Sequence, residues 1–209
     1  MNFNLMSQYN ILENRFPGRR AALKREILEQ ALHCFNELGV EATTIDAIKA
    51  RCETSVGAIY HHFGNKEGIL SMLFFVAQDD QRQHFEHELA KTNSLREAVY
   101  SIISSYLDWV VAHPEWARFL YQARSPVAKG PFHQELKDRN AKNYQELKEK
   151  LLSFENKDIK IVLPFEILSS LIVGPSENYC RAWLASRVQT SPRDYREEFA
   201  ESAWRSLQR

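Results

Sequence analysis

The stretch TTIDAIKARCETSVGAIYHHFGNK, residues 43–66, predicts two short helices joined by a tight turn. The second helix begins with small residues and ends in Tyr60, His61 and His62. Such a helix suits insertion into a groove of duplex DNA, because its backbone can approach base edges while its longer side chains reach phosphate oxygens. DNA recognition is therefore the leading hypothesis for this chain.

Helix caps and apolar spacing support this interpretation. Thr43 or Thr44 can cap the first helix and Ser55 the second, because their hydroxyls accept hydrogen bonds from free backbone N–H groups. Ile59 and Phe63 form the inward stripe of the second helix. The first helix has apolar residues at spacings of three and four, namely Ile45, Ile48 and Cys52.

Gly57 stands near the start of the second helix, where glycine lowers helix propensity by about 1 kcal/mol relative to alanine. Two explanations carry equal weight at this position. A ligand backbone approaches the helix closely there, or the first turn of a helix simply tolerates glycine.

Residues 20–73 resemble the N-terminal domain of the TetR (tetracycline-repressor-like) family of bacterial transcriptional regulators. The resemblance is carried by ILEQALHCFNELGVEATTIDAI, residues 27–48, and SVGAIYHHFGNKEGIL, residues 55–70. It implies phosphate contacts from Thr44, Tyr60, His62 and Lys66. It also implies proximity to base edges for Val56, Gly57, Ala58 and His61.

The turn departs from the family pattern. Proteins of this family usually have Ala-Gly-Val there, whereas this chain has Cys52-Glu53-Thr54. Without the glycine, we expect Glu53 to take the left-handed conformation, which strains a residue with a Cβ.

The helix before the motif follows helical spacing and ends at Gly39, a suitable C-terminal stop. A basic arm at and before its start includes Arg19 and Arg20. Such an arm can lie along phosphates or enter the minor groove. The alternative is a solvated, charged terminus; beside a helix-turn-helix we favour DNA contact.

Length and composition limit the class of protein. The 209 residues suffice for one large or two small domains, and the formal net charge is zero, so any basic surface is local. The three scattered cysteines, Cys34, Cys52 and Cys180, fit a reducing cytosol without disulfides. No segment reads as a signal peptide or a membrane span. We therefore expect a soluble cytoplasmic protein with no membrane partner.

Every later segment is typical of helix, so we expect an all-α fold of about nine helices. The expected organisation is an N-terminal extension (1–18), a helix-turn-helix domain (19–79, motif 43–63) and an effector-binding and dimerisation domain (80–209). The Pro/Gly content of residues 125–131 predicts a break there, and Gly174-Pro175 predicts a kink or restart.

The last two predicted helices, about 157–186 and 192–207, carry more apolar surface than one neighbouring helix can cover. In proteins of the resembled family the corresponding pair forms a four-helix dimer interface, which predicts a homodimer here. The candidate interface residues are Leu168, Leu171, Ile172, Trp183, Phe199, Ala203 and Leu207. Ordinary packing within the chain must account for some of them.

The resemblance also implies an effector cavity among the middle helices. Its candidate lining is mostly aromatic, because small-molecule sites are mostly apolar with few polar groups. The candidates are Trp109, Trp116, Phe119, Tyr144, Phe165, Glu166 and Tyr179. Taken singly, each aromatic residue is more typical of core packing.

The rival classes are a helical protein-interaction scaffold and a small helical enzyme. His84 and His87 have helical spacing with glutamates beside them, but no third metal ligand is placed, so a solvated helix is favoured. The sequence has neither a nucleophile elbow nor a phosphate loop, so we expect no catalytic residues, cofactor or metal. The expected function is a repressor that binds a palindromic DNA operator as a homodimer and is released by a small-molecule effector.

Overall fold

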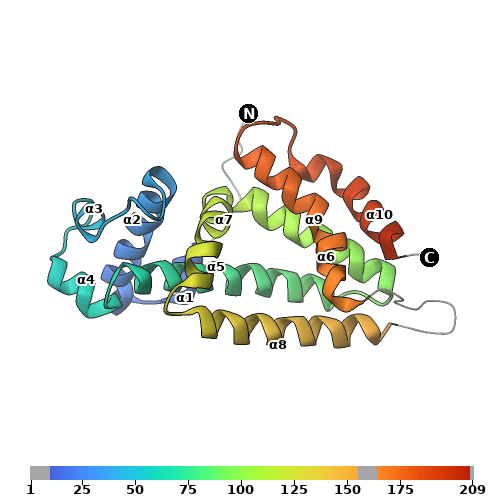
Figure 1. Cartoon of the computed structure of the whole chain (residues 1–209), viewed down its shortest axis with the longest axis horizontal. Coiled ribbons are helices and arrows are strands. Elements are labelled where there is room, and N and C mark those ends of the chain that lie inside the picture. Colours follow the sequence, from blue (N-terminus) through green and yellow to red (C-terminus); the bar gives the residue numbers. More distant parts are fainter. Residues whose placement is uncertain (1–9, 155–163, 208–209) are drawn as a thin grey trace. The chain divides into compact units, whose positions relative to one another are not determined.

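The computed structural model describes residues 10–154 and 164–207, and the described residues form helices and no strand (Figure 1). This confirms the all-α prediction. The helices are α1 Ile11–Arg15, α2 Ala22–Leu38, α3 Ile45–Lys49, α4 Val56–Phe63, α5 Lys66–Leu89, α6 Leu95–Ala112, α7 Pro114–Lys129, α8 His133–Leu152, α9 Phe165–Leu184 and α10 Arg196–Leu207, with 3-10 turns η1 Arg19–Ala21 and η2 Pro192–Tyr195.

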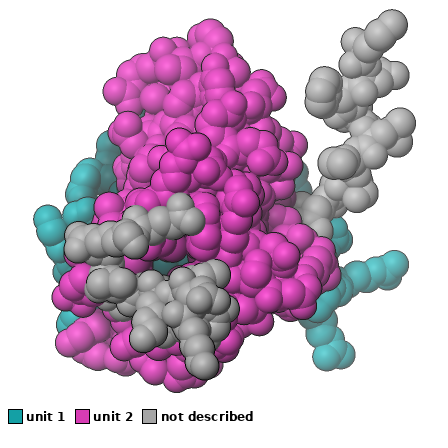
Figure 2. Space-filling view, turned by 90° about the vertical axis from the view of Figure 1, so that its right-hand side faces the viewer, with its two compact units in different colours: residues 1–80, 119–133 teal, residues 81–118, 134–209 magenta. Residues whose placement is uncertain are grey.

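The chain divides into two compact units, drawn in different colours in Figure 2. Unit 1 holds the described residues up to Asp80 together with Phe119–His133. Unit 2 holds Gln81–Arg118 and the described residues from Gln134 onward. The first boundary falls inside α5, one residue beyond the expected position. Residues 119–133 belong to unit 1, although the sequence predicts them in the effector domain.

Unit 1 is built on α2, whose apolar face packs against the helix-turn-helix. Ile27, Ala31 and Phe35 are fully buried, as the helical spacing predicts, whereas Leu38 is 48% exposed. The ring of Phe119 from α7 lies 5.7 Å from that of Phe35, measured between centroids. Burial of these large apolar side chains is the main stabilising term of the unit.

Part of the predicted extension forms a small helix on unit 1. The side chain of Asn10 caps α1 by accepting from the backbone N–H groups of Leu12 and Glu13. Ile11 and Leu12 are buried, so α1 packs by a short apolar face. Arg15 on α1 pairs with Asp79 on α5 at 3.5 Å. The segment from residue 10 onward is therefore part of the folded unit.

In unit 2, α6 packs against α9 and α10, and these three helices lie side by side (Figure 1). The part of α5 in this unit is joined to α8 by an ion pair between Arg82 and Glu146. Leu168, Ile172, Cys180 and Leu184 make the buried stripe of α9.

The two helix breaks that the sequence predicts, at residues 125–131 and at Gly174-Pro175, differ in outcome. The predicted break within residues 125–131 is present but shorter, because α7 continues through Pro126 to Lys129 and α8 begins at His133. Burial of Phe119, Ala123 and Val127 on one face of α7 offsets the hydrogen bond lost at the proline. Likewise α9 continues through Pro175, which lies on its exposed side, so no restart occurs there.

Cys34, Cys52 and Cys180 are all free thiols. Within the part of the chain that the structure describes, no helix is both long and apolar enough to cross a lipid bilayer.

Candidate nucleic-acid interface

Helix α4 presents one face to the protein and the other to solvent. Ile59 is fully buried and Phe63 is 8% exposed, as the predicted inward stripe requires. On the other side Tyr60 is 49% exposed, and His61 and His62 are exposed with ring centroids 5.5 Å apart. The exposed face therefore carries one hydroxyl and two imidazoles that can reach a partner.

The N-terminal tip of α4 is small and open. The Ser55 hydroxyl caps the helix by accepting from the Ala58 N–H at 3.1 Å. A Cβ added at Gly57 would meet only Ser55 Oγ, at 3.8 Å. The protein's own packing therefore does not require glycine here, which favours close approach of a partner over a structural need. Val56 and Ala58 are half-buried beside it.

The two neighbouring threonines have different roles. The hydroxyl of Thr43 is buried and donates to the carbonyls of Cys34 and Gly39. Thr44 is exposed and caps α3 by accepting from the Ala47 N–H at 3.1 Å. Of the two caps that the sequence left open, Thr44 is the one used, and it stays accessible at the surface.

The turn between α3 and α4 does not use a left-handed residue. Among the described residues only Ser186 has a positive φ without being glycine, so the prediction for Glu53 is wrong. The Glu53 N–H instead donates to a carboxylate oxygen of Glu26 at 3.0 Å, which ties the turn to α2. The partner, Glu26, is distant in the chain, so the sequence of the turn alone does not predict this hydrogen bond.

A second tie to α2 lies beside the turn. Arg51 pairs with Glu37 at 2.5 Å, and the hydrogen bond from Arg51 lowers the pKa of that carboxyl. Burial raises the pKa of the neighbouring Cys52 thiol to about 11, so it is uncharged at neutral pH.

The junction between α4 and α5 holds α4 at a defined angle. Gly64 ends α4 with φ 76°, a conformation that glycine adopts without strain. A Cβ at Gly68 would lie 2.0 Å from the carbonyl oxygen of Phe63, so only glycine fits this crossing. Asn65 caps α5 by accepting from the Gly68 N–H at 2.8 Å.

Lys66 is engaged within the protein. Its ammonium donates to the carbonyl oxygens of Val40 and Glu41, each at 3.1 Å. This geometry gives Lys66 a positioning role at the start of α5, and a phosphate contact from it stays a prediction. Sequence reasoning missed this role because carbonyl partners are set by the path of the chain.

The basic arm lies directly before and at the start of α2, the main helix of unit 1. Arg19 and Arg20 form the exposed turn η1, and within residues 10–154 and 164–207 neither pairs with a carboxylate. Arg25 is used differently, because its guanidinium donates to the carbonyls of Phe16 and Gly18 at 2.7 and 2.8 Å. The arm is thus held in place by one arginine while the other two stay available.

Residues 27–73 match the family model described as bacterial regulatory proteins, tetR family. The helix-turn-helix of this chain therefore matches that of the TetR family. The matched residues include the whole of α3 and α4, the helix-turn-helix whose geometry is given above.

Two kinds of relative extend this result. The chain is 35% identical over 91 residues to the transcriptional repressor AcnR of Corynebacterium jeikeium, covering 43% of this chain and 46% of AcnR. The alignments with the other AcnR repressors likewise span about half the length of those proteins.

Two solved structures are similar to this chain in fold. The structure of the ketosteroid transcriptional regulator KstR2 of Mycobacterium tuberculosis has a TM-score of 0.72 at 18% identity, covering 93% of this chain and 100% of KstR2. A FadR regulator from Bacillus subtilis, solved with stearoyl-CoA, has a TM-score of 0.66 at 16% identity, covering 86% of this chain and 97% of FadR. At these identities the two structures establish the fold.

The residues predicted to line an effector cavity are divided between the two units, and their role stays a prediction. Phe119 lies in the core of unit 1, whereas Trp109 is buried in unit 2. Tyr144 on α8 is 38% exposed, and Tyr179 donates to the Thr190 carbonyl. Of the rest, Trp116 is half-buried, Glu166 is exposed, and the side chain of Phe165 lies outside the described residues. Size and apolarity predicted burial, but they do not predict which buried groups face a cavity.

The predicted interface residues fall into two groups. Four of them, Leu168, Ile172, Ala203 and Leu207, are at most 7% exposed within the single chain and belong to its core. Leu171, Trp183 and Phe199 are half-buried and stay available to a partner. Ile167 and Tyr195 add exposed apolar surface, at 41% and 40%.

Metal binding at His84 and His87 was weighed against a solvated helix. Among the residues that the structure describes, no group of three His, Cys, Asp or Glu side chains is placed to hold a metal ion.

Proposed function

We propose that this chain is a ligand-responsive, DNA-binding transcriptional regulator, and specifically a repressor that acts in the cytoplasm. The observation that carries the proposal is the exposed tip and outer face of α4, on a helix-turn-helix that matches the TetR family. The curated relatives named as transcriptional repressors support repression rather than activation of transcription.

The proposed DNA contacts divide by chemistry. Arg19 and Arg20, with hydroxyls from Thr44 and Ser55, face the phosphates, together with Tyr60 and His62. The tip of α4 at Val56, Gly57 and Ala58, with His61, enters the major groove. Contacts to phosphate position a protein on DNA, whereas contacts to base edges select the sequence.

A homodimer completes the proposal. A two-fold pair places two recognition helices about 34–36 Å apart, one turn of duplex, and therefore reads a palindromic operator. The apolar side chains left uncovered on α9, η2 and α10 support a dimer face there, namely Ile167, Leu171, Trp183, Tyr195 and Phe199.

The proposed response to an effector is a population shift. An effector that prefers a state with wrongly spaced recognition helices releases DNA, by an amount limited to its differential affinity for the two states. Helix α5 runs from the DNA-binding unit into unit 2 without a break, which supports it as the mechanical link. A FadR neighbour solved with stearoyl-CoA supports ligand binding in this fold.

The experiment is selection of bound duplexes from a random pool, followed by affinity measurement over a range of salt concentrations. We expect a two-fold symmetric site and an affinity that falls steeply with salt, since phosphate contacts release counterions. A scaffold protein would select no duplex, and an enzyme would turn over the small molecules that it binds. Either result would overturn the proposal.

A further inference from the structure

The basic arm before α2 uses its positive charges in two different ways. Residues 14–25 hold five cationic side chains and no carboxylate, namely Arg15, Arg19, Arg20, Lys24 and Arg25. Arg15, Lys24 and Arg25 make contacts within unit 1. Arg19 and Arg20 are exposed, and neither has a carboxylate partner in the parts of the chain that the structure describes. Three cations therefore build the arm, and two are left for a partner.

Arg25 holds the segment directly before the two exposed arginines. Its Nη1 donates to the carbonyl oxygen of Phe16 at 2.7 Å and to that of Gly18 at 2.8 Å. Hydrogen bonds from a charged donor are stronger than those between neutral groups. One guanidinium nitrogen thus fixes the path of the backbone from the end of α1 to the start of η1.

The backbone of Gly18 has a conformation that sets the direction of η1. Its φ of 83° and ψ of 168° lie in a region that is essentially restricted to glycine. A Cβ there would meet nothing within 4 Å, so the conformation requires glycine and the available space does not. The carbonyl oxygen of Gly18 also accepts from the Ala21 N–H at 3.3 Å, which closes the turn that carries Arg19 and Arg20.

Helix α1 anchors the other end of the arm. Its apolar face is buried, and Arg15 in its last turn pairs with Asp79 on α5 at 3.5 Å. The ammonium of Lys24 on α2 lies 4.2 Å from the centroid of the Phe16 ring, which is within the range of a cation–π interaction. The arm is therefore held on both sides of Gly18.

The same part of α2 also holds the recognition helix. Glu26, the residue after Arg25, accepts from the Glu53 N–H at 3.0 Å in the turn that precedes α4. Two adjacent residues of α2 thus tie down the arm and the α3–α4 turn. A segment that is ordered before binding loses less conformational entropy when its partner arrives.

We infer that Arg25 is a positioning residue for DNA binding, which holds η1 so that Arg19 and Arg20 meet phosphates while α4 occupies the groove. Arg25 itself stays on its two carbonyls. The inference rests on the proposed function, because it names the contacts that prepare the arm of that regulator for the DNA backbone.

The test is a cycle of variants in the full chain, titrated against the selected duplex. Arg25→Met removes the donors and should weaken binding roughly tenfold, yet should have no further effect in Arg19→Ala/Arg20→Ala, through which it acts. Gly18→Ala keeps every charge and should behave in the same way. The matched control is Lys129→Met, which removes an exposed cation from the end of α7 and should leave the affinity unchanged.

Salt dependence separates positioning from direct contact. Loss of Arg19 and Arg20 should reduce the slope of log affinity against log salt by about two, as loss of two phosphate contacts does. Arg25→Met should shift the parent slope toward that of Arg19→Ala/Arg20→Ala and leave the slope of the latter unchanged. A further loss of about one in that background would show that Arg25 contacts DNA itself, and would overturn the inference.

A measurement without DNA tests the arm directly. In Arg25→Met, hydrogen exchange at the amides of residues 19–22 should become faster, while exchange in the buried part of α2 stays as in the parent chain. Faster exchange along the whole of α2 would show a merely structural role and would also overturn the inference. If the parent chain selects no duplex, the proposed function fails. If the parent binds duplex and Arg25→Met binds equally tightly, only this inference fails.

Discussion

Gly57 illustrates what one residue can decide at the tip of α4. Its added Cβ would have only one neighbour in the protein, Ser55 Oγ at 3.8 Å, so the fold itself tolerates a side chain there. Gly68 is the opposite case, because its Cβ would collide with a backbone carbonyl at 2.0 Å. The fold therefore requires glycine at position 68 but not at position 57, where we propose that a DNA partner requires it.

The change Gly57→Leu should abolish operator binding, because a branched side chain at the tip blocks entry into the groove. The free energy of unfolding should change by less than about 1 kcal/mol, since the added atoms face open space and leucine favours helix. Band-shift titration and urea unfolding on the same preparation measure operator affinity and the free energy of unfolding.

Tyr60→Phe is the companion variant, and it should weaken binding to all DNA sequences alike. Unchanged operator affinity in Gly57→Leu would contradict the proposed docking.

The change Gly68→Ala should destabilise unit 1 by about 1–3 kcal/mol, as overpacking against rigid backbone does. The Phe63 carbonyl cannot move without displacing the end of α4. Chemical denaturation measures the loss, and Gly174→Ala is the control, because a Cβ there meets nothing within 4 Å. Equal stability of the two variants would show that the α4–α5 junction is less tight than described.

At the scale of elements, α6 and α10 are joined by a cluster of ionic contacts on one carboxylate. Glu201 accepts from Tyr100 at 2.5 Å, from Arg205 at 2.9 Å and from Arg96 at 3.0 Å. These hydrogen bonds, that of Tyr100 foremost, lower the pKa of Glu201 from 4.5 to about 2. The contacts therefore favour the charged carboxylate in the folded chain.

This cluster makes a prediction about pH. Because the folded-state pKa of Glu201 lies below its ordinary value, its contribution to stability is complete above 4.5 and is lost as the pH falls toward 2. We expect Glu201→Gln to be less stable than the parent chain at about pH 6, and the difference to shrink as the pH falls below 4.5. Urea unfolding across this range measures it. Glu198→Gln removes the same charge from α10 without these hydrogen bonds and serves as the control; a difference that stays constant with pH would contradict the assignment.

At the scale of the whole molecule, the proposed regulator works only as a two-fold pair. The side chains at the surface of α9 and α10 can serve the partner, whereas those in the core cannot, and neighbouring residues differ in this respect. Ile167 is 41% exposed, while Leu168, the next residue, is 1% exposed.

The change Ile167→Asp should weaken self-association by about 1–3 kcal/mol, as loss of a central apolar contact does, while each subunit stays folded. Sedimentation velocity over a concentration series measures the association. Leu168→Ala should instead lower the free energy of unfolding by about 2–5 kcal/mol through the cavity that it leaves. If Ile167→Asp associates as the parent chain does, α9 is not part of the dimer face.

Local sequence was sufficient to predict much of unit 1. The caps at Thr44, Ser55 and Asn65 and the inward stripe of Ile59 and Phe63 depend on residues within one or two turns, so they were predictable. The conformation of Glu53 was not predictable from local sequence, because its backbone N–H donates to Glu26, which is distant in the chain.

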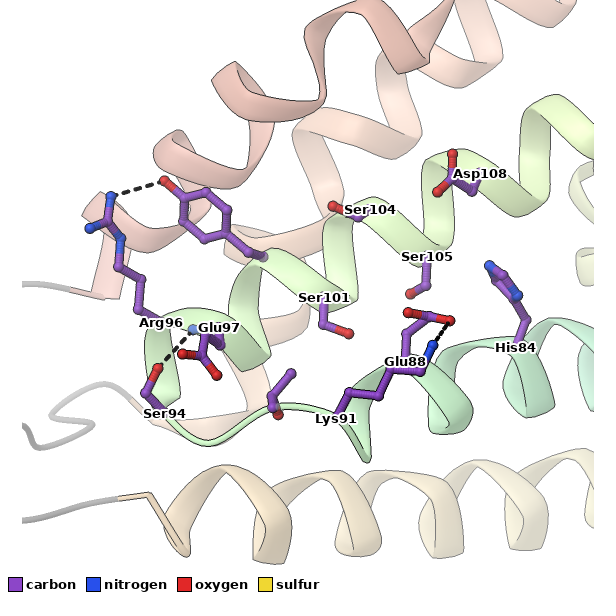
Figure 3. A pocket seen from close by; sticks show the side chains of 12 residues that line it. His84, Glu88, Lys91, Ser94, Arg96, Glu97, Ser101, Ser104, Ser105 and Asp108 are labelled. Carbon is purple, nitrogen blue, oxygen red and sulfur yellow. Dashed lines mark hydrogen bonds and ion pairs between the residues drawn. The ribbon is translucent and has the colours of Figure 1, made fainter.

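The helical class, the helix-turn-helix and its family followed from periodicity, capping and motif, all of which are properties of short segments. Tertiary structure alone decided which apolar side chains became core and which stayed at the surface of α9 and α10, because burial depends on what packs opposite. It also decided where unit 2 is hollow. A pocket lined mostly by serines and charged residues lies between the end of α5 and α6 (Figure 3), since a cavity forms where facing helices leave space, and side-chain size does not encode that space.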